Sequence, residues 1–92
     1  MTLNRHNPRR DANEPVICDY LDNRGIPYWR MSGPGIPDLL ILHKGLFKLL
    51  EVKTPTGRLK PAQVEFFTLC RDYSVKHLYV VRSIDDLTEA LR

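Results

Sequence analysis

Residues 38–53 read DLLILHKGLFKLLEVK, two apolar runs separated only by Lys44-Gly45. A two-residue step containing glycine between apolar runs is typical of a tight β-hairpin turn. Both faces of the two runs are mainly apolar, which is the pattern of central strands that are covered on both sides. The stretch therefore predicts a hairpin in the middle of a sheet. Its two ends nevertheless carry charge, at Asp38, Glu51 and Lys53.

The turn also fixes how the two strands pair. If only Lys44 and Gly45 lie in the loop, each strand position has one partner, and Asp38 stands opposite Glu51. Side chains alternate between the faces of a strand, so Lys53 shares the face of both acids. Opposed Cβ atoms lie about 4.5–5.5 Å apart, and like charges at that separation are destabilising. A longer loop would shift this register, so the pairing depends on the turn.

Two arrangements would offset the cost of burying these carboxylates. Lys53 could neutralise one of them in a structural ion pair. Alternatively, a divalent cation could lie between Asp38 and Glu51, with the backbone carbonyl of Val52 as a third ligand. Hard cations such as Mg²⁺ take oxygen ligands and keep several waters, so a set of this kind suffices. Both arrangements stay open on the residues alone.

The rest of the chain predicts an α/β domain with the element order α-β-β-β-α-β and a C-terminal helix. Asn13 is expected to cap the first helix, and Trp29 is expected in the core. We predict a basic arm over residues 1–12 and a single domain over residues 13–92. Helices are expected at residues 13–24, from Pro61 onward and after Ser83, and strands at residues 26–32, 38–43, 46–53 and 76–82.

Composition narrows the class of protein. The 92 residues give a net charge of +3, which permits a polyanionic partner without requiring one. Cys18 and Cys70 form no CxxC pair and are expected as buried free thiols. No apolar run reaches transmembrane length, and the first residues lack the apolar core of a signal peptide. We therefore expect a cytoplasmic protein with no membrane partner.

The motif Pro37-Asp38 followed by Glu51-Val52-Lys53 resembles the signature of the PD-(D/E)xK nuclease superfamily. With Gly35 in front of it and Gln63 opening the next helix, the pattern GIPD…EVK…GRLKPAQVEFF is more narrowly similar to the virus-type replication-repair nuclease (VRR-NUC) domain. The resemblance spans residues 13 to 83. It implies the superfamily's nuclease core, a mixed sheet flanked by helices.

The resemblance also implies a chemistry and roles for site residues. The expected reaction is metal-dependent hydrolysis of a phosphodiester, with Mg²⁺ or Mn²⁺ held by Asp38, Glu51 and the Val52 carbonyl. Lys53 is expected to orient the attacking water or to stabilise the charge that develops on the phosphoryl group. Gln63 is expected to hydrogen-bond that water or a metal ligand; without the resemblance it would be a solvated helix residue.

The family has an acidic residue on its first helix, and Glu14 is the best match for it. Glu14 lies before Pro15 at the helix start, where an acid also compensates the helix dipole without any active site. A ligand role and a dipole role therefore remain equally open. Asp19 and Asp22 are possible substitutes.

The implied partner is DNA. Stand-alone family members act as dimers on branched DNA such as four-way (Holliday) junctions, so a homodimer is expected here, with residues 26–31 in its interface. Two alternatives are a nuclease subunit targeted by a partner and a non-catalytic nucleic-acid-binding module. Family habit points to a phage or mobile element acting in the host cytoplasm. The residues expected to hold DNA are Arg58, Lys60, Lys48, Arg9, Arg10 and Arg30.

Overall fold

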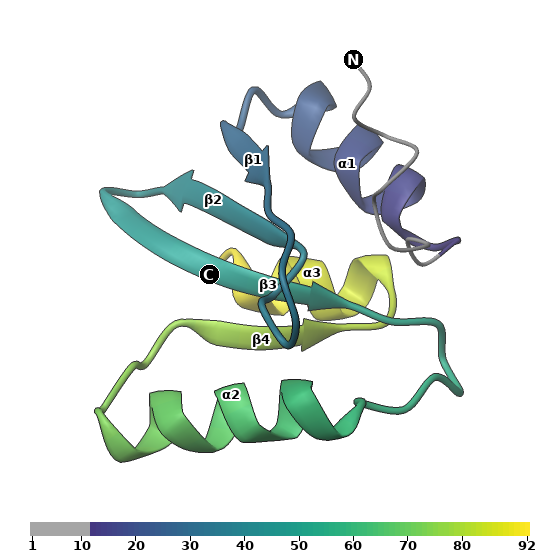
Figure 1. Cartoon of the computed structure of the whole chain (residues 1–92). Helices are drawn as coiled ribbons and strands as arrows, with labels where there is room; N and C mark the ends of the chain where they lie inside the picture. The colour runs from purple at the N-terminus through teal and green to yellow at the C-terminus, as the bar shows by residue number, and fades with distance from the viewer. Residues whose placement is uncertain (1–11) are drawn as a thin grey trace.

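The computed structural model describes residues 12–92 and contains a four-stranded sheet with three helices (Figure 1). The predicted order α-β-β-β-α-β-α is confirmed. Along the chain the elements are α1 (Glu14–Asn23), β1 (Tyr28–Arg30), β2 (Leu39–His43), β3 (Leu46–Val52), α2 (Pro61–Asp72), β4 (Leu78–Val81) and α3 (Ile84–Ala90).

The sheet has the strand order β1-β2-β3-β4. Its first three strands are antiparallel, whereas β3 and β4 run parallel and are joined through α2. The hairpin register is the predicted one, with His43 opposite Leu46 and Leu40 opposite Leu49. Lys44 and Gly45 have φ values of 54° and 77°. Positive φ at both central residues is what a two-residue type I′ turn requires, so the short turn locks the pairing.

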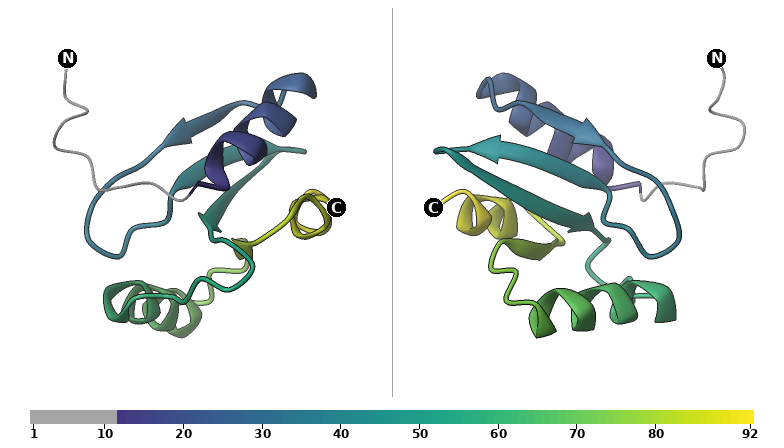
Figure 2. Two further views of the ribbon diagram at one scale, coloured as in Figure 1. Left: turned by 90° about the vertical axis from the view of Figure 1, so that its right-hand side faces the viewer. Right: turned by 60° about the vertical axis from the view of Figure 1, so that its left-hand side comes forward.

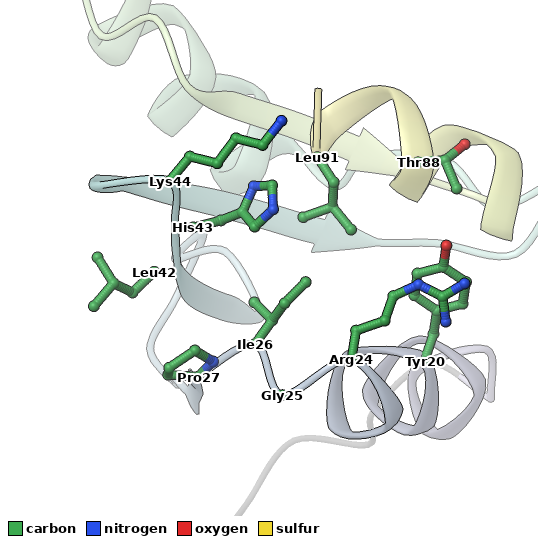
Figure 3. Close-up of a pocket in the computed structure, with 10 residues that line it drawn as sticks. All are labelled: Tyr20, Arg24, Gly25, Ile26, Pro27, Leu42, His43, Lys44, Thr88 and Leu91. Atoms are coloured by element: carbon green, nitrogen blue, oxygen red, sulfur yellow. The ribbon is translucent and has the colours of Figure 1, made fainter.

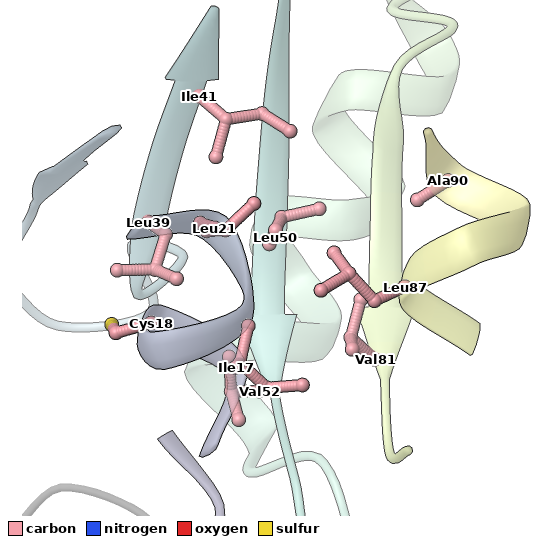
Figure 4. Packing of buried hydrophobic residues seen from close by; sticks show 10 residues of the cluster. All are labelled: Ile17, Cys18, Leu21, Leu39, Ile41, Leu50, Val52, Val81, Leu87 and Ala90. Carbon is pink, nitrogen blue, oxygen red and sulfur yellow. The ribbon is translucent and has the colours of Figure 1, made fainter. Parts of the chain in front are cut away.

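One face of the sheet is covered by α1 and α3, and α2 lies by itself on the β4 side (Figure 2). Between the covered face and these two helices lies the hydrophobic core (Figure 4). Burying each of its large aliphatic side chains contributes about 1.5–3 kcal/mol. Both cysteines are buried free thiols, as predicted. The core consists of Ile17, Cys18, Leu21, Leu39, Ile41, Leu50, Val52, Val81, Leu87 and Ala90.

The opposite face of the hairpin is less well covered. Trp29 pairs with Leu40, and Phe47 pairs with Leu42, so all four side chains share this face. Trp29 is 50% exposed and Phe47 is 61% exposed. The expectation that Trp29 lies in the core is therefore wrong, because its register directs it away from α1 and α3.

Asn13 lies just before α1, but its side chain does not cap the helix. Its amide instead donates hydrogen bonds to the Lys53 carbonyl at 3.1 Å and to the Arg82 carbonyl at 3.0 Å. The expected capping role is thus corrected: Asn13 joins the start of α1 to the ends of β3 and β4. The helix expected after Ser83 is α3, and the Ser83 hydroxyl caps it by accepting a hydrogen bond of 3.1 Å from the Asp86 N–H. No helix in residues 12–92 has the length and apolarity needed to cross a membrane.

Candidate active site

Asp38 and Glu51 meet at the end of the hairpin that lies farthest from its turn. Leu39 pairs with Leu50, so the next step outward places Asp38 opposite Glu51, as predicted. Oδ2 of Asp38 accepts a hydrogen bond of 2.8 Å from the Val52 N–H. The carboxyl of Asp38 is therefore fixed across the end of β3, beside that of Glu51.

Glu51 is only 1% exposed, and its two carboxyl oxygens differ in their surroundings. Oε2 accepts a hydrogen bond of 2.9 Å from Nε2 of Gln63 and lies 3.7 Å from Nζ of Lys53. Oε1 is buried and receives no hydrogen bond from any residue in the described range 12–92. Burial, and then the adjacent charge of Asp38, raise the pKa of Glu51 to about 7, while Lys53 acts in the opposite direction.

This arrangement has the properties of a cation site. Two carboxyl groups side by side repel unless a proton or a cation lies between them. The bare Oε1 of Glu51 supplies a buried acceptor that hydrogen bonding has not used. A strand residue directs its N–H and its C=O to the same neighbouring strand, so the Val52 carbonyl is directed to the side of Asp38. The residues present therefore fit a hard divalent cation with Asp38, Glu51 and the Val52 carbonyl as ligands.

Lys53 follows β3 and is 8% exposed. Its N–H donates 3.0 Å to the Val81 carbonyl, which continues the pairing of β3 with β4. The next loop lies against the lysine stem, since a Cβ at Gly57 would be in ordinary contact, 3.6 Å, with Cδ of Lys53. Pairing of the Lys53 backbone with β4, and contact of its stem with the loop that contains Gly57, thus hold the ammonium beside Glu51.

Gln63 reaches the site from the first turn of α2. Its Oε1 accepts 2.8 Å from the Lys60 N–H, while its Nε2 donates to Glu51. The side chain thus satisfies a free N–H at the helix start and a buried carboxylate at once. Gln63 is therefore a site residue and not a merely solvated one.

Glu14 is 2% exposed at the start of α1, and Arg30 of β1 pairs with it at 3.2 Å. The same guanidinium donates to the Cys18 sulfur at 3.6 Å. No group of three or more His, Cys, Asp or Glu side chains in residues 12–92 is arranged to hold a metal ion. The structure thus gives Glu14 a pairing role with Arg30 and does not gather it with Asp38 and Glu51.

The residues expected to hold DNA are found in different places. Arg58 and Lys60 are exposed in the loop between Lys53 and α2. Lys48 is only 2% exposed, and its ammonium donates 2.7 Å to the Ala90 carbonyl at the end of α3. The expectation for Lys48 is corrected, because a buried ammonium committed to a helix terminus cannot reach a phosphate. Arg9 and Arg10, with the arm to which they belong, lie outside the described residues.

Two functional candidates have no signal in the residue pattern. Arg82 donates to three carbonyls of the loop after Lys53, and Asn13 bridges the ends of β3 and β4. Their partners are main-chain atoms, which every residue possesses. The sequence shows that an arginine follows the apolar strand β4, but no residue pattern could predict which carbonyls it contacts.

A hollow of about 610 Å³ lies at the turn end of the hairpin, away from Asp38 and Glu51. Arg24, His43 and Lys44 give it a basic lining (Figure 3). Burial, and then the charges of Lys48 and Lys44, lower the pKa of His43. None of Asp38, Glu51, Lys53 and Gln63 lines this hollow, so the candidate active site lies elsewhere on the molecule.

Comparison with known proteins identifies the family of this chain. The family model of the VRR-NUC domain matches residues 14–82, three quarters of the chain. Comparisons with curated proteins and with solved structures find no match. The matched range contains Asp38, Glu51, Lys53 and Gln63. The chain therefore belongs to the VRR-NUC family of nuclease domains.

Proposed function

We propose that this nuclease domain is a metal-dependent DNA endonuclease that uses Mg²⁺ or Mn²⁺ to hydrolyse phosphodiester bonds. The observation that carries the proposal is the carboxyl of Glu51. One of its oxygens is held by Gln63 near Lys53, and the other is buried without a donor among the described residues. The charge of Asp38 acts on the same carboxyl. A purely structural ion cluster would be expected to use both oxygens, because an unmatched buried acceptor costs about 1–3 kcal/mol.

Asp38, Glu51 and the Val52 carbonyl would hold the cation. When bound, a divalent cation polarises a phosphoryl oxygen and lowers the pKa of a water, which makes that water a nucleophile near neutral pH. The remaining chemistry belongs to the chain. The Lys53 ammonium, held close to Glu51, stabilises negative charge that develops on the phosphoryl group. Gln63 keeps the Glu51 carboxyl in one orientation, which limits the directions a ligand can approach from.

The substrate is proposed to be branched DNA, and the active form a homodimer. A chain of 92 residues with a net charge of +3 makes few phosphate contacts alone, and DNA affinity depends on their number. Two copies related by a two-fold axis would place two sites on a symmetric junction. The half-exposed Trp29 and the exposed Phe47 offer apolar surface for pairing.

Incubation with labelled DNA of different shapes tests this function. Duplex, flap, single-stranded and four-way-junction DNA are each supplied with Mg²⁺, Mn²⁺ or a chelator. We expect cleavage that needs metal, is greatest on the junction, and is lost in Asp38→Asn. Metal-independent cutting that survives in Asp38→Asn would contradict the proposed site.

Two alternatives predict other outcomes of the same experiment. A nuclease subunit that depends on a partner for targeting would cut all DNA shapes slowly and without preference. A non-catalytic module would bind DNA and cut none of it, although it would then have kept a buried Glu51 next to the like charge of Asp38 without a use. Cleavage by the isolated chain with a junction preference would exclude both.

A further inference from the structure

The loop of residues 54–60 links two parts of the candidate site. It begins directly after Lys53 and ends at Lys60, whose N–H is bound by Gln63. It also carries Arg58, one of the two exposed cations expected to hold DNA. This loop contains no helix or strand, and a turn hydrogen bond of 3.1 Å from the Gly57 N–H to the Thr54 carbonyl constrains it only locally.

The side chain of Arg82 ties this turn to the end of β4. Its Nη1 donates to the Gly57 carbonyl at 2.6 Å, to the Thr54 carbonyl at 2.8 Å and more weakly to the Pro55 carbonyl at 3.5 Å. These contacts span 25 to 28 positions of the sequence, so one guanidinium gathers the first half of the loop. Hydrogen bonds from charged donors are about twice as strong as neutral ones.

The backbone of Arg82 is itself anchored on both sides. Its N–H donates a hydrogen bond of 2.9 Å to Oδ2 of Asp86, and its carbonyl accepts one of 3.0 Å from the side-chain amide of Asn13. The same Asn13 amide also donates to the Lys53 carbonyl. Arg82 therefore extends from a fixed point at the end of β4, and the root of the loop is tied to that point.

We propose that Arg82 is a positioning residue of this nuclease. It holds residues 54–57 so that Arg58 and Lys60 face the DNA backbone and Lys53 stays covered beside Glu51. The inference rests on the proposed function, because it assigns Arg58 and Lys60 to phosphate contacts. Arg82 acts through the loop and needs no contact with substrate.

The test uses Arg82→Lys, which keeps the charge but replaces the guanidinium, whose Nη1 makes all three loop contacts, by an ammonium on a shorter side chain. Arg71→Lys is the matched control, because Arg71 is exposed and pairs only loosely with the adjacent Asp72, at 4.0 Å. We expect trypsin to cut the Arg58–Leu59 bond at least about fivefold faster in Arg82→Lys, since cleavage of a folded protein follows local opening. Its melting temperature should stay close to that of the wild type, and the control should behave as wild type in both assays.

DNA binding in Ca²⁺ gives the second readout. Arg82→Lys should weaken binding about tenfold and flatten the dependence of log affinity on log salt by about 0.9 for each phosphate that the loop no longer neutralises. The same substitution in an Arg58→Gln/Lys60→Gln background should cause no further loss, because coupled residues are not additive. Asn13→Ser weakens the contact that anchors the Arg82 carbonyl. It should change trypsin cutting at Arg58 and DNA binding in the same direction as Arg82→Lys, but by less. This variant replaces Arg82→Lys in the test if Arg82→Lys does not fold.

The outcomes separate this inference from the proposed function. Unchanged cutting at Arg58, or full additivity with the loop substitutions, would overturn the role of Arg82 and leave the nuclease proposal standing. A wild-type protein that neither binds nor cuts DNA would overturn the proposed function. In that case faster cutting at Arg58 would still show that Arg82 orders the loop, but its DNA role would be refuted.

Discussion

Gln63 turns its donor nitrogen, and not its oxygen, toward Glu51: Nε2 lies 2.9 Å from Oε2 of the carboxylate. The orientation follows from the other end of the amide, whose oxygen accepts the Lys60 N–H at 2.8 Å. A backbone group at the start of α2 therefore decides that Gln63 meets Glu51 as a hydrogen-bond donor. The other oxygen, Oε1, stays buried and receives no hydrogen bond from residues 12–92.

Neutralising either acid should weaken metal binding. Asp38→Asn and Glu51→Gln each keep the size of the side chain and lose a charged oxygen ligand, so Mn²⁺ affinity should fall by at least about tenfold, as expected when charged ligands of a hard cation are removed. Isothermal titration calorimetry measures this. Glu14→Gln is the matched control and should bind Mn²⁺ within about threefold of the wild type, because Arg30 pairs with Glu14. Equal binding by wild type and Asp38→Asn would remove the metal site.

Lys53 should matter more for cleavage than for DNA binding. Lys53→Met keeps the apolar stem under the loop and removes the ammonium that lies 3.7 Å from Glu51. We expect kcat to fall by about 10²-fold or more, as is typical when a group that stabilises transition-state charge is lost. Affinity for junction DNA in Ca²⁺ should change by less than about threefold. Melting curves are needed alongside, because a variant that unfolds would point to a structural ion pair instead.

The hairpin and its acids could be predicted from the sequence because one local feature decides them. The two-residue turn at Lys44-Gly45 allows a single register, and that register brings Asp38 to Glu51. Lys48 and Trp29 could not be placed this way. Their environments depend on which face α1 and α3 cover, and both faces of the hairpin are apolar. The contacts of Asn13 and Arg82 were equally hidden, since main-chain carbonyls leave no trace in a residue pattern.

The stability of the metal-free protein should fall as the pH rises from about 4.5 to 7. The pKa of Glu51 is raised from 4.5 to about 7 in the folded state, so folding favours its protonated form. The stabilisation from that proton is complete below the unfolded pKa and is lost as the pH passes the folded one. The melting temperature of wild type minus that of Glu51→Gln, measured in chelator, should decrease across this range. A difference that stays constant with pH would contradict the assignment.

Gly35 should tolerate no side chain, because it lies against the start of α2. Its φ is +75°, and a Cβ there would collide with the Ala62 carbonyl oxygen and lie 2.8 Å from the carbonyl carbon. Gly35→Ala should therefore destabilise the fold by about 1–3 kcal/mol, the usual scale of local backbone strain. It should also reduce cleavage, because Gln63 follows Ala62 directly.

Gly25→Ala is the matched control for this prediction. Gly25 has a φ of +67°, but nothing lies within 4 Å of the position that a Cβ would take there, so only the left-handed conformation is penalised. It should cost about 1–2 kcal/mol of stability and leave the cleavage rate of the folded protein unchanged. Urea unfolding and cleavage rates below the transition measure both effects. Equal loss of activity in the two variants would show that contact with α2 is not the cause.

The proposed homodimer should depend on the apolar face that carries Trp29 and Phe47. These side chains share one face of the hairpin, and they are 50% and 61% exposed in the single chain. A second copy would cover this surface and add its own phosphate contacts, which raises the effective concentration for a second DNA arm. Light scattering at micromolar concentration should give twice the mass of the chain, and Trp29→Ser/Phe47→Ser should give the monomer. Val64→Ser is the control, because Val64 is 48% exposed on α2 and not on this face.

Competition in Ca²⁺ should show that the dimer prefers a four-way junction to duplex of equal length and that the double variant has lost the preference. A wild-type monomer that cuts junction and duplex equally would refute the dimer and the junction preference, and would leave the metal site of Asp38 and Glu51 to be judged on the titrations alone.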